Sequence, residues 1–176
     1  PLNAKTGKLD PQSELKESTI TATLCYPYQT MLSTTVCIDT DVAKINPGKK
    51  VCDLKELVFN NGQGAPIAVT KIEPQMIPVE NEIKPQFLIF VENKGKGNPV
   101  NIVGYDGTCY KSDYNKDSWN VATVKVYKSG KEEDPESQLI CTPSLKDSQG
   151  VMYETTGLIR FRDNKDFVRC TFKKGI

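Results

Sequence analysis

Six cysteines are the residues of this chain whose spacing most directly indicates a chemistry. No two of them are close enough for a Cys-x-x-Cys redox motif or for the paired ligands of a zinc site. Each stands inside or beside a strand-like run, which favours structural disulfides formed in an oxidising compartment. Six buried, reduced thiols in a cytosolic protein are the alternative. We expect disulfides, in a connectivity that the sequence leaves open, at Cys25, Cys37, Cys52, Cys109, Cys141 and Cys170.

Histidine is absent from the chain. Its absence removes Ser-His-Asp and Cys-His nucleophile systems, His-ligated zinc and most general-base chemistry near neutral pH. Carboxylates, lysines and tyrosines remain, but no two carboxylates stand out as a catalytic pair. We therefore expect a protein that binds or assembles and is not an enzyme.

One loop spaces oxygen-bearing side chains at alternate positions. Asp113, Asn115 and Asp117 match the beginning of many calcium-binding loops, because alternate spacing lets oxygen ligands curl around one ion. The glycine expected next is Ser118, and Val124 stands at the twelfth position, where an acidic ligand is expected. A solvated acidic loop is thus favoured over a calcium site, and no other cofactor is expected. Asp39 and Asp41 form a second, weaker pair of this type.

Three tyrosines gather on the same stretch of chain. Tyr105, Tyr110 and Tyr114 would offer an aromatic platform for stacking against a sugar ring if they were exposed on one loop. They support the hypothesis of a carbohydrate- or protein-binding adhesion domain within a larger surface protein.

Charge and hydropathy exclude two kinds of partner. The 23 basic and 22 acidic side chains give a net charge of +1, which provides no general attraction to nucleic acid. The longest purely apolar run, Phe87 to Val91, is far too short to cross a bilayer. We expect neither nucleic-acid binding nor direct membrane insertion.

The elements that would position these residues are strands. Alternation of apolar and polar residues, β-branched composition and breaks at glycine and proline favour short strands throughout. Pro74 is expected to end one strand, residues 78–85 to form a proline-bounded loop, and residues 163–166 to join the last two strands in a hairpin. The central strand is expected at 86–92. The other strands are expected at 18–26, 31–39, 51–59, 67–72, 100–105, 119–127, 139–141, 158–162 and 167–172.

The segment from Ala65 to Gly97, with the runs APIAVTKIE and FLIFVENKGKG, resembles part of the CARDB-type and other immunoglobulin-like domains of archaeal or bacterial surface proteins. The run WNVATVKVYKSGK, Trp119 to Lys131, is similar to the strand that follows in such domains. The resemblance covers about a third of the chain and implies an extracellular β-sandwich used in adhesion or assembly. It carries over no catalytic residue.

Together these patterns predict an all-β protein, an immunoglobulin-like β-sandwich of about 8–10 short strands with disulfides. Residues 1–17 would form a polar N-terminal arm, and residues 18–176 a single domain. The arm leads into a regular strand with Ile20, Ala22, Leu24 and Tyr26 on one face. An arm followed by such a strand is what β-strand addition requires.

The leading hypothesis is therefore an extracellular or cell-surface structural subunit. Its partners would be copies of itself, joined by β-strand addition into a filament or surface layer. Pairing of residues 18–26 within their own domain is the alternative for this segment. For the protein as a whole, binding to another surface protein or to a glycan is the alternative.

Overall fold

The computed structural model describes residues 5, 7, 8, 11, 12, 15, 17, 19, 22–42, 48, 50–80, 82–101, 118–132, 134–147 and 149–175. Over these residues the chain forms eight β-strands, which confirms the predicted all-β class. The same residues contain no membrane-crossing helix.

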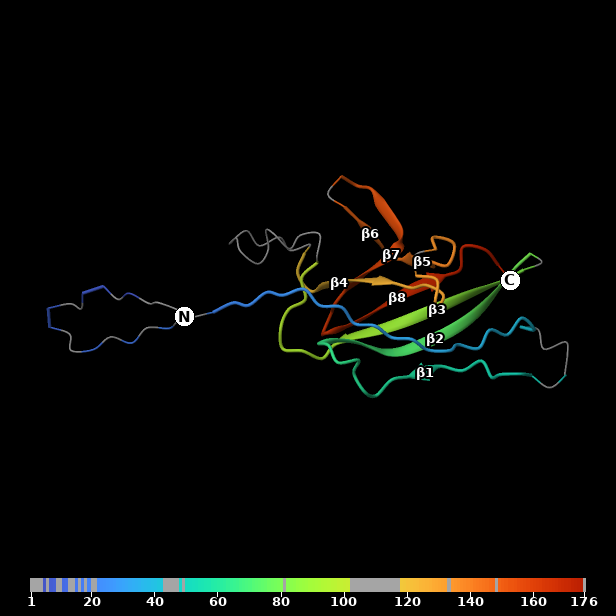
Figure 1. Cartoon of the computed structure of the whole chain (residues 1–176), viewed down its shortest axis with the longest axis horizontal. Coiled ribbons are helices and arrows are strands. Elements are labelled where there is room, and N and C mark those ends of the chain that lie inside the picture. Colours follow the sequence, from blue (N-terminus) through green and yellow to red (C-terminus); the bar gives the residue numbers. More distant parts are fainter. Residues whose placement is uncertain are drawn as a thin grey trace.

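The strands form two antiparallel sheets (Figure 1). The larger sheet has the order β1-β2-β3-β8-β5 and the smaller has the order β4-β7-β6. The larger sheet contains β1 (Leu57–Val58), β2 (Ile67–Val79), β3 (Glu82–Asn93), β8 (Lys165–Thr171) and β5 (Ile140–Thr142). The smaller sheet contains β4 (Val121–Lys125), β7 (Met152–Arg160) and β6 (Ser144–Lys146). The central position predicted for residues 86–92 is confirmed, since β3 is the third of five strands.

The β2–β3 hairpin is much longer than the sequence predicted. β2 continues through Pro74 and Pro78 to Val79, and β3 begins at Glu82, so the expected break at Pro74 and the expected loop at 78–85 are both wrong. The chain turns instead at Glu80, which has a positive φ of 51°. Proline is tolerated in a strand wherever the missing N–H would point away from the neighbouring strand.

The hydrogen bonds at the margins of the hairpin show that this condition is met. Phe59 N donates to Thr70 O, and Phe172 N donates to Pro85 O. Together with the strand register, these bonds direct the N–H and C=O groups of residues 74, 76 and 78 away from β3, toward the outer edge. Pro74 and Pro78 therefore remove no hydrogen bond from the hairpin.

One core joins the two sheets. Alternate residues of β3 face inward, where Phe87, Ile89 and Val91 are buried against Ile159 and Leu139 from the other side. Gly157 of β7 lies close to the larger sheet: a Cβ at this position would come within 2.6 Å of Val168 and 3.0 Å of Cys141. A side chain at residue 157 would therefore push the sheets apart.

The turn before the last strand is tight, but its flanking strands separate. Asp163 and Asn164 both have positive φ, 50° and 64°, as the central residues of a type I′ turn do. Beyond the bridge between Arg162 and Lys165, however, β7 pairs with β4 and β6, whereas β8 pairs with β3 and β5. The predicted turn is present, and the predicted long hairpin is wrong because each strand finds a better neighbour in a different sheet.

A disulfide joins neighbouring strands within the larger sheet. Cys141 of β5 and Cys170 of β8 are direct cross-strand partners with their Cα atoms 4.1 Å apart, and both are fully buried. Immunoglobulin domains instead join their two sheets by the conserved disulfide. The two-sheet architecture with disulfides is thus present, whereas an immunoglobulin-like topology stays a prediction.

Candidate functional site

The segment between Ala22 and Asp39 is extended but belongs to no strand. In Figure 1 it is the blue thread that runs in the direction of the β2–β3 hairpin. The predicted strand at 18–26 is therefore not formed at the described positions Thr19 and 22–26, and the predicted strand at 31–39 is not formed either. Alternation makes a segment competent to pair, but a strand forms only where a neighbouring edge offers its backbone groups.

Apolar side chains of this segment face solvent. Leu24 is 88% exposed, Tyr26 is 64% exposed, and Ala22 is also exposed; Ile20, the fourth residue of the predicted assembly face, lies outside the described residues. Met31 adds a further exposed side chain at 67%. An exposed leucine followed by exposed aromatic and thioether side chains leaves an apolar surface uncovered.

The second half of the same segment is attached to the domain. Thr30 Oγ1 donates a hydrogen bond of 2.7 Å to Ile67 O at the start of β2. Leu32 and Val36 then pack against the hydrophobic core, as do Leu57 and Phe59 from the returning chain. Thr30, Leu32 and Val36 therefore attach this half of the segment to the domain, although Met31 between them is exposed.

Two cysteines of the segment from Ala22 to Asp39 are disulfide-bonded. Cys37 is bonded to Cys52, with their Cα atoms 5.8 Å apart, and Cys25 is disulfide-bonded as well. Cys109, the remaining predicted disulfide residue, lies outside the described residues. Two cysteines of this segment, Cys25 and Cys37, are therefore held by disulfides.

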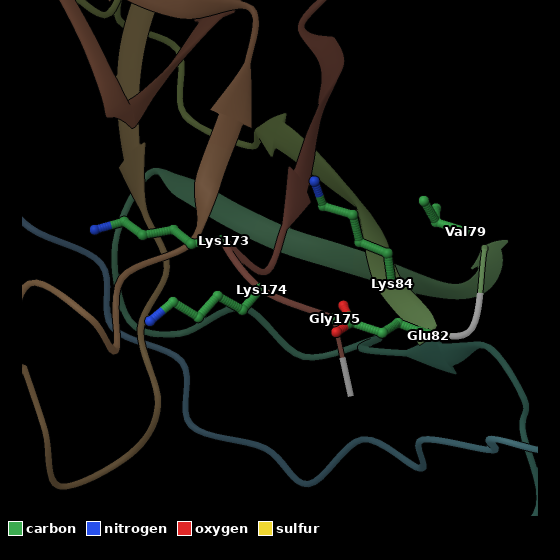
Figure 2. Close-up of a pocket in the computed structure, with 6 residues that line it drawn as sticks. All are labelled: Val79, Glu82, Lys84, Lys173, Lys174 and Gly175. Atoms are coloured by element: carbon green, nitrogen blue, oxygen red, sulfur yellow. The ribbon is translucent and has the colours of Figure 1, made fainter.

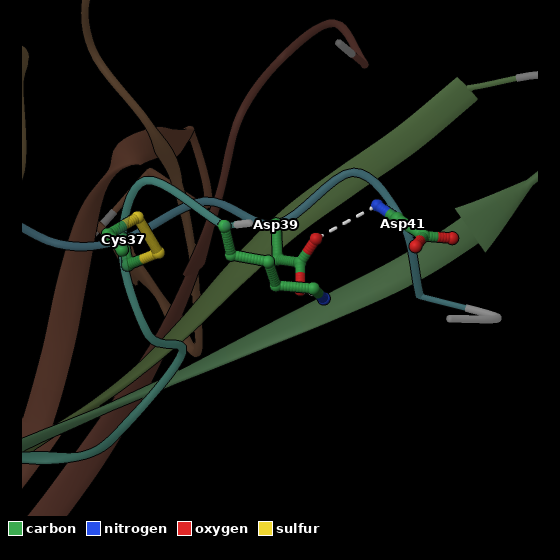
Figure 3. Close-up of polar contacts among 5 residues, drawn as sticks. Cys37, Asp39 and Asp41 are labelled. Atoms are coloured by element: carbon green, nitrogen blue, oxygen red, sulfur yellow. Dashed lines mark hydrogen bonds and ion pairs between the residues drawn. A yellow bond between two sulfur atoms is a disulfide. The ribbon is translucent and has the colours of Figure 1, made fainter. Parts of the chain in front are cut away.

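Beside the Cys37–Cys52 disulfide lies a small charged cluster (Figure 3). Lys50 Nζ donates to Asp39 Oδ2, and Asp41 N donates to Asp39 Oδ1 at 3.0 Å. The hydrogen bond to Asp39 is the largest cause of a raised pKa at Lys50. Asp39 is thus paired with a cation from its own chain, which leaves this carboxylate poorly placed to hold a metal ion.

An open cavity of about 440 Å³ lies between the tip of the β2–β3 hairpin and the C-terminal tail (Figure 2). Lys173 Nζ donates to Pro135 O, and Lys174 pairs with Glu136 at 3.6 Å. None of the cavity's described lining residues carries a hydroxyl or thiol nucleophile. Its lining consists of Val79, Glu82, Lys84, Lys173, Lys174 and Gly175. This mixture of one acidic and several basic side chains does not point to a particular ligand or reaction.

The other predicted site residues cannot be placed. Tyr105, Tyr110 and Tyr114 of the aromatic platform lie outside the described residues, as do the calcium candidates Asp113, Asn115 and Asp117. Among the described residues, no group of three or more Asp, Glu or Cys side chains is arranged to hold a metal ion. The calcium site and the tyrosine platform stay predictions.

Comparison with protein-family models, characterised proteins and solved structures found no match to this chain. The resemblance to CARDB-type domains is therefore left as a sequence-based prediction. What the chain can do has to be argued from its own geometry, in which the exposed segment described from Ala22, which belongs to neither sheet, is the most unusual feature.

Proposed function

We propose that this protein is a non-catalytic extracellular structural subunit that joins copies of itself by β-strand addition into a filament or surface layer. One observation carries the proposal: Leu24 is 88% exposed in a segment that has strand alternation but belongs to neither sheet. In strand addition, main-chain hydrogen bonds to a neighbouring sheet supply affinity, and alternate side chains supply specificity.

The disulfides support the location that this function requires. Cys37–Cys52 and Cys141–Cys170 indicate an oxidising, non-cytosolic environment. A cell-surface polymer also needs a rigid body to carry the connecting segment, and the two-sheet domain with its buried disulfide provides one. A contact that repeats head to tail without closing generates a fibre.

Electron microscopy of the native, unreduced protein tests the proposal. We expect regular filaments or sheets from the full chain. Leu24→Asp should abolish them, because a charged side chain cannot be buried against a neighbouring sheet without a partner. The fully exposed Val51, in the Cys37–Cys52 loop, supplies the matched control: Val51→Asp should leave assembly intact. Dispersed particles from the unaltered protein at every concentration would overturn the proposal.

The alternative of glycan binding draws on a different surface. Phe90 and Phe167 lie 5.5 Å apart, centroid to centroid, on the outer face of the larger sheet, and Phe167 is 41% exposed. Exposed aromatic rings are suitable for stacking against sugars. A glycan array with the unaltered protein and Phe167→Ala tests this function, and equal signals from the two proteins would argue against it.

A further inference from the structure

The strand-addition hypothesis requires an acceptor edge, and the sheets differ in what their edges offer. The outer edge of β2 is blocked over much of its length. Residues 74, 76 and 78 direct their backbone groups outward, but Pro74 and Pro78 have no N–H, so Met76 supplies the single outward donor of the three. Prolines of this kind are a known protection against edge-to-edge pairing.

The edge at β5 is closed by the other sheet. β5 has three residues, and its only outward-facing residue is the fully buried Cys141. Immediately after β5, Leu158 N of β7 donates to Pro143 O. β6 also has three residues, and its register with β7 is interrupted by a bulge between Ser144 and Leu145. Neither strand gives a regular run of open backbone groups.

The outer edge of β4 is regular, and beyond Val121 it has no neighbouring strand among the described residues. Phe161 N donates to Asn120 O, which together with the β4–β7 register directs the backbone groups of Val121, Thr123 and Lys125 away from β7. Val121 N is used by Pro99 O at 3.3 Å. The bonds around the Tyr127–Gln138 bridge direct Tyr127 outward too. Within the described residues, no backbone hydrogen bond reaches the outward groups of Thr123, Lys125 or Tyr127.

We propose that the outer edge of β4, from Thr123 to Tyr127, is the acceptor that binds residues 18–24 of a second copy of this chain. This inference rests on the proposed strand-addition function and names its receptor. The bound segment would satisfy three N–H and three C=O groups that no backbone hydrogen bond reaches within the described residues. It ends before Cys25, which is disulfide-bonded.

The side chains of donor and acceptor match in spacing. Ala122, Val124 and Val126 direct their side chains to the core and are only partly covered. An antiparallel donor with Ala22 opposite Val124 places Leu24 beside Ala122 and Ile20 beside Val126, so each apolar donor residue meets an apolar neighbour. The intervening donor threonines then face solvent, alongside the exposed Thr123 and Lys125.

Charge favours this antiparallel direction. It brings residues 14–17 of the donor, which carry Glu14, Lys16 and Glu17 and a net charge of −1, toward residues 125–132 of β4 and its extension. That stretch carries a net charge of +2, from three lysines and Glu132. A parallel donor would carry the same carboxylates toward residues 118–120, a described stretch without a cation. Opposite charges steer association and fix register.

Proline substitution tests the edge directly. Lys125→Pro removes an outward N–H that β7 does not use, and we expect the protein concentration needed for assembly to rise by about tenfold or more. Met76→Pro removes the corresponding outward N–H from the edge of β2 and should leave assembly unchanged. Circular dichroism and thermal unfolding identify variants that fail to fold.

A cross-linking experiment avoids reliance on folding. Polymer is prepared from equal parts of unlabelled and nitrogen-15-labelled protein and treated with a zero-length carbodiimide cross-linker. Mass spectrometry should find mixed-label cross-links between Glu14 or Glu17 of one copy and Lys125 or Lys128 of another. Cross-links from these carboxylates to lysines of β2, β3 or the tail, without any to β4, would overturn the inference.

The outcomes separate the two hypotheses. Loss of assembly in Leu24→Asp, together with normal assembly in Lys125→Pro, would keep strand addition and reject β4 as the acceptor. Normal assembly in both would reject strand addition itself. If both variants fail alone, mixing them should yield dimers and no polymer, because Leu24→Asp retains an intact acceptor and Lys125→Pro an intact donor. Failure to form such dimers would also reject the pairing of these two elements.

Discussion

Two segments with similar strand patterns differ in structure: one is a central strand, and the other belongs to no sheet. Glu82–Asn93 alternates inward and outward residues, pairs with β2 on one side and β8 on the other, and buries Phe87, Ile89 and Val91. The stretch from Ala22 to Asp39 is as rich in β-branched residues, but it forms no strand and exposes Leu24 and Met31. A strand forms only when its backbone groups bond to a neighbouring strand. The sequence pattern therefore makes a segment able to pair, and the neighbouring strands decide whether it does.

The comparison also explains the asymmetry of the edges. Beyond β1, the outer edge of β2 carries Pro74 and Pro78, whereas among the described residues no backbone hydrogen bond reaches the outward N–H groups of Thr123 and Lys125 on β4. Proline at an edge protects a sheet against pairing with another chain. The proposed strand addition would use this difference between the two edges.

The largest expected effect on the free energy of unfolding comes from a substitution in the well-paired region. Ile159 is fully buried at the contact between the sheets, so Ile159→Ala should reduce the free energy of unfolding by about 2–5 kcal/mol. In the unpaired segment, Leu24→Ala should change the same free energy by no more than about 0.5 kcal/mol. Urea denaturation of the two variants, monitored by circular dichroism, measures both values. A comparable loss in Leu24→Ala would mean that this side chain is buried in solution.

A second, smaller contrast is expected between the losses of stability caused by removing each of the two disulfides. Removing the cross-strand pair with Cys141→Ala and Cys170→Ala should cost about 2–5 kcal/mol of unfolding free energy, since the bond closes a loop inside the cooperative core. Removing Cys37 and Cys52 together should cost less, because their bond closes a loop in the region with little strand pairing. Differential scanning calorimetry under non-reducing conditions compares them. Equal losses would place the 37–52 loop within the same cooperative unit.

The smallest effect concerns pH. Asp147, in the loop between β6 and β7, accepts hydrogen bonds from Val151 N and Gln149 N and contacts Tyr153 Oη; the bond from Val151 is the largest cause of its lowered pKa. A carboxyl pKa that is lower in the folded state stabilises the fold above the ordinary value of 3.8 and loses that contribution as pH falls through the folded value.

The variant Asp147→Asn should therefore show less loss of stability than the unaltered protein on acidification from about pH 5 to pH 2. Amide chemical shifts of Val151 and Gln149 across this titration report the loop directly. Unchanged shifts of both amides while Asp147 titrates would contradict the assigned hydrogen bonds.

Much of the sheet could be predicted from local pattern, and the exceptions have physical reasons. Residues 86–92 and 119–127 contain enough alternation and β-branched mass to indicate β3 and β4. The break predicted at Pro74 failed because proline stops a strand only when its missing N–H faces a neighbour, and sequence does not reveal that direction. The prediction of the last hairpin failed for a related reason. The turn at Asp163 and Asn164 depends on local sequence, whereas the sheet that each flanking strand joins depends on residues far away in the chain.

The candidate assembly elements divide in the same way. Alternation at Ala22 and Leu24 indicated the proposed donor from sequence, since period-2 patterning is visible whether or not the segment pairs. The proposed acceptor could not be predicted, because nothing in the run from Thr123 to Tyr127 indicates which side of the strand lacks a neighbour. The pairing of Asp39 with Lys50 was also invisible, since it depends on the disulfide that brings the two ends of the loop together.

By itself, the sequence determined the all-β class, the absence of histidine-dependent chemistry, the cysteines available for disulfides and the alternating segment beyond the polar arm. These are properties of residue type and of spacing over a few positions. The tertiary structure decided that Cys37 pairs with Cys52 and Cys141 with Cys170, which described strands have a neighbour, and that the segment from Ala22 to Asp39 joins neither sheet. These depend on long-range packing, where backbone hydrogen bonds and buried apolar area are shared between residues far apart in the chain.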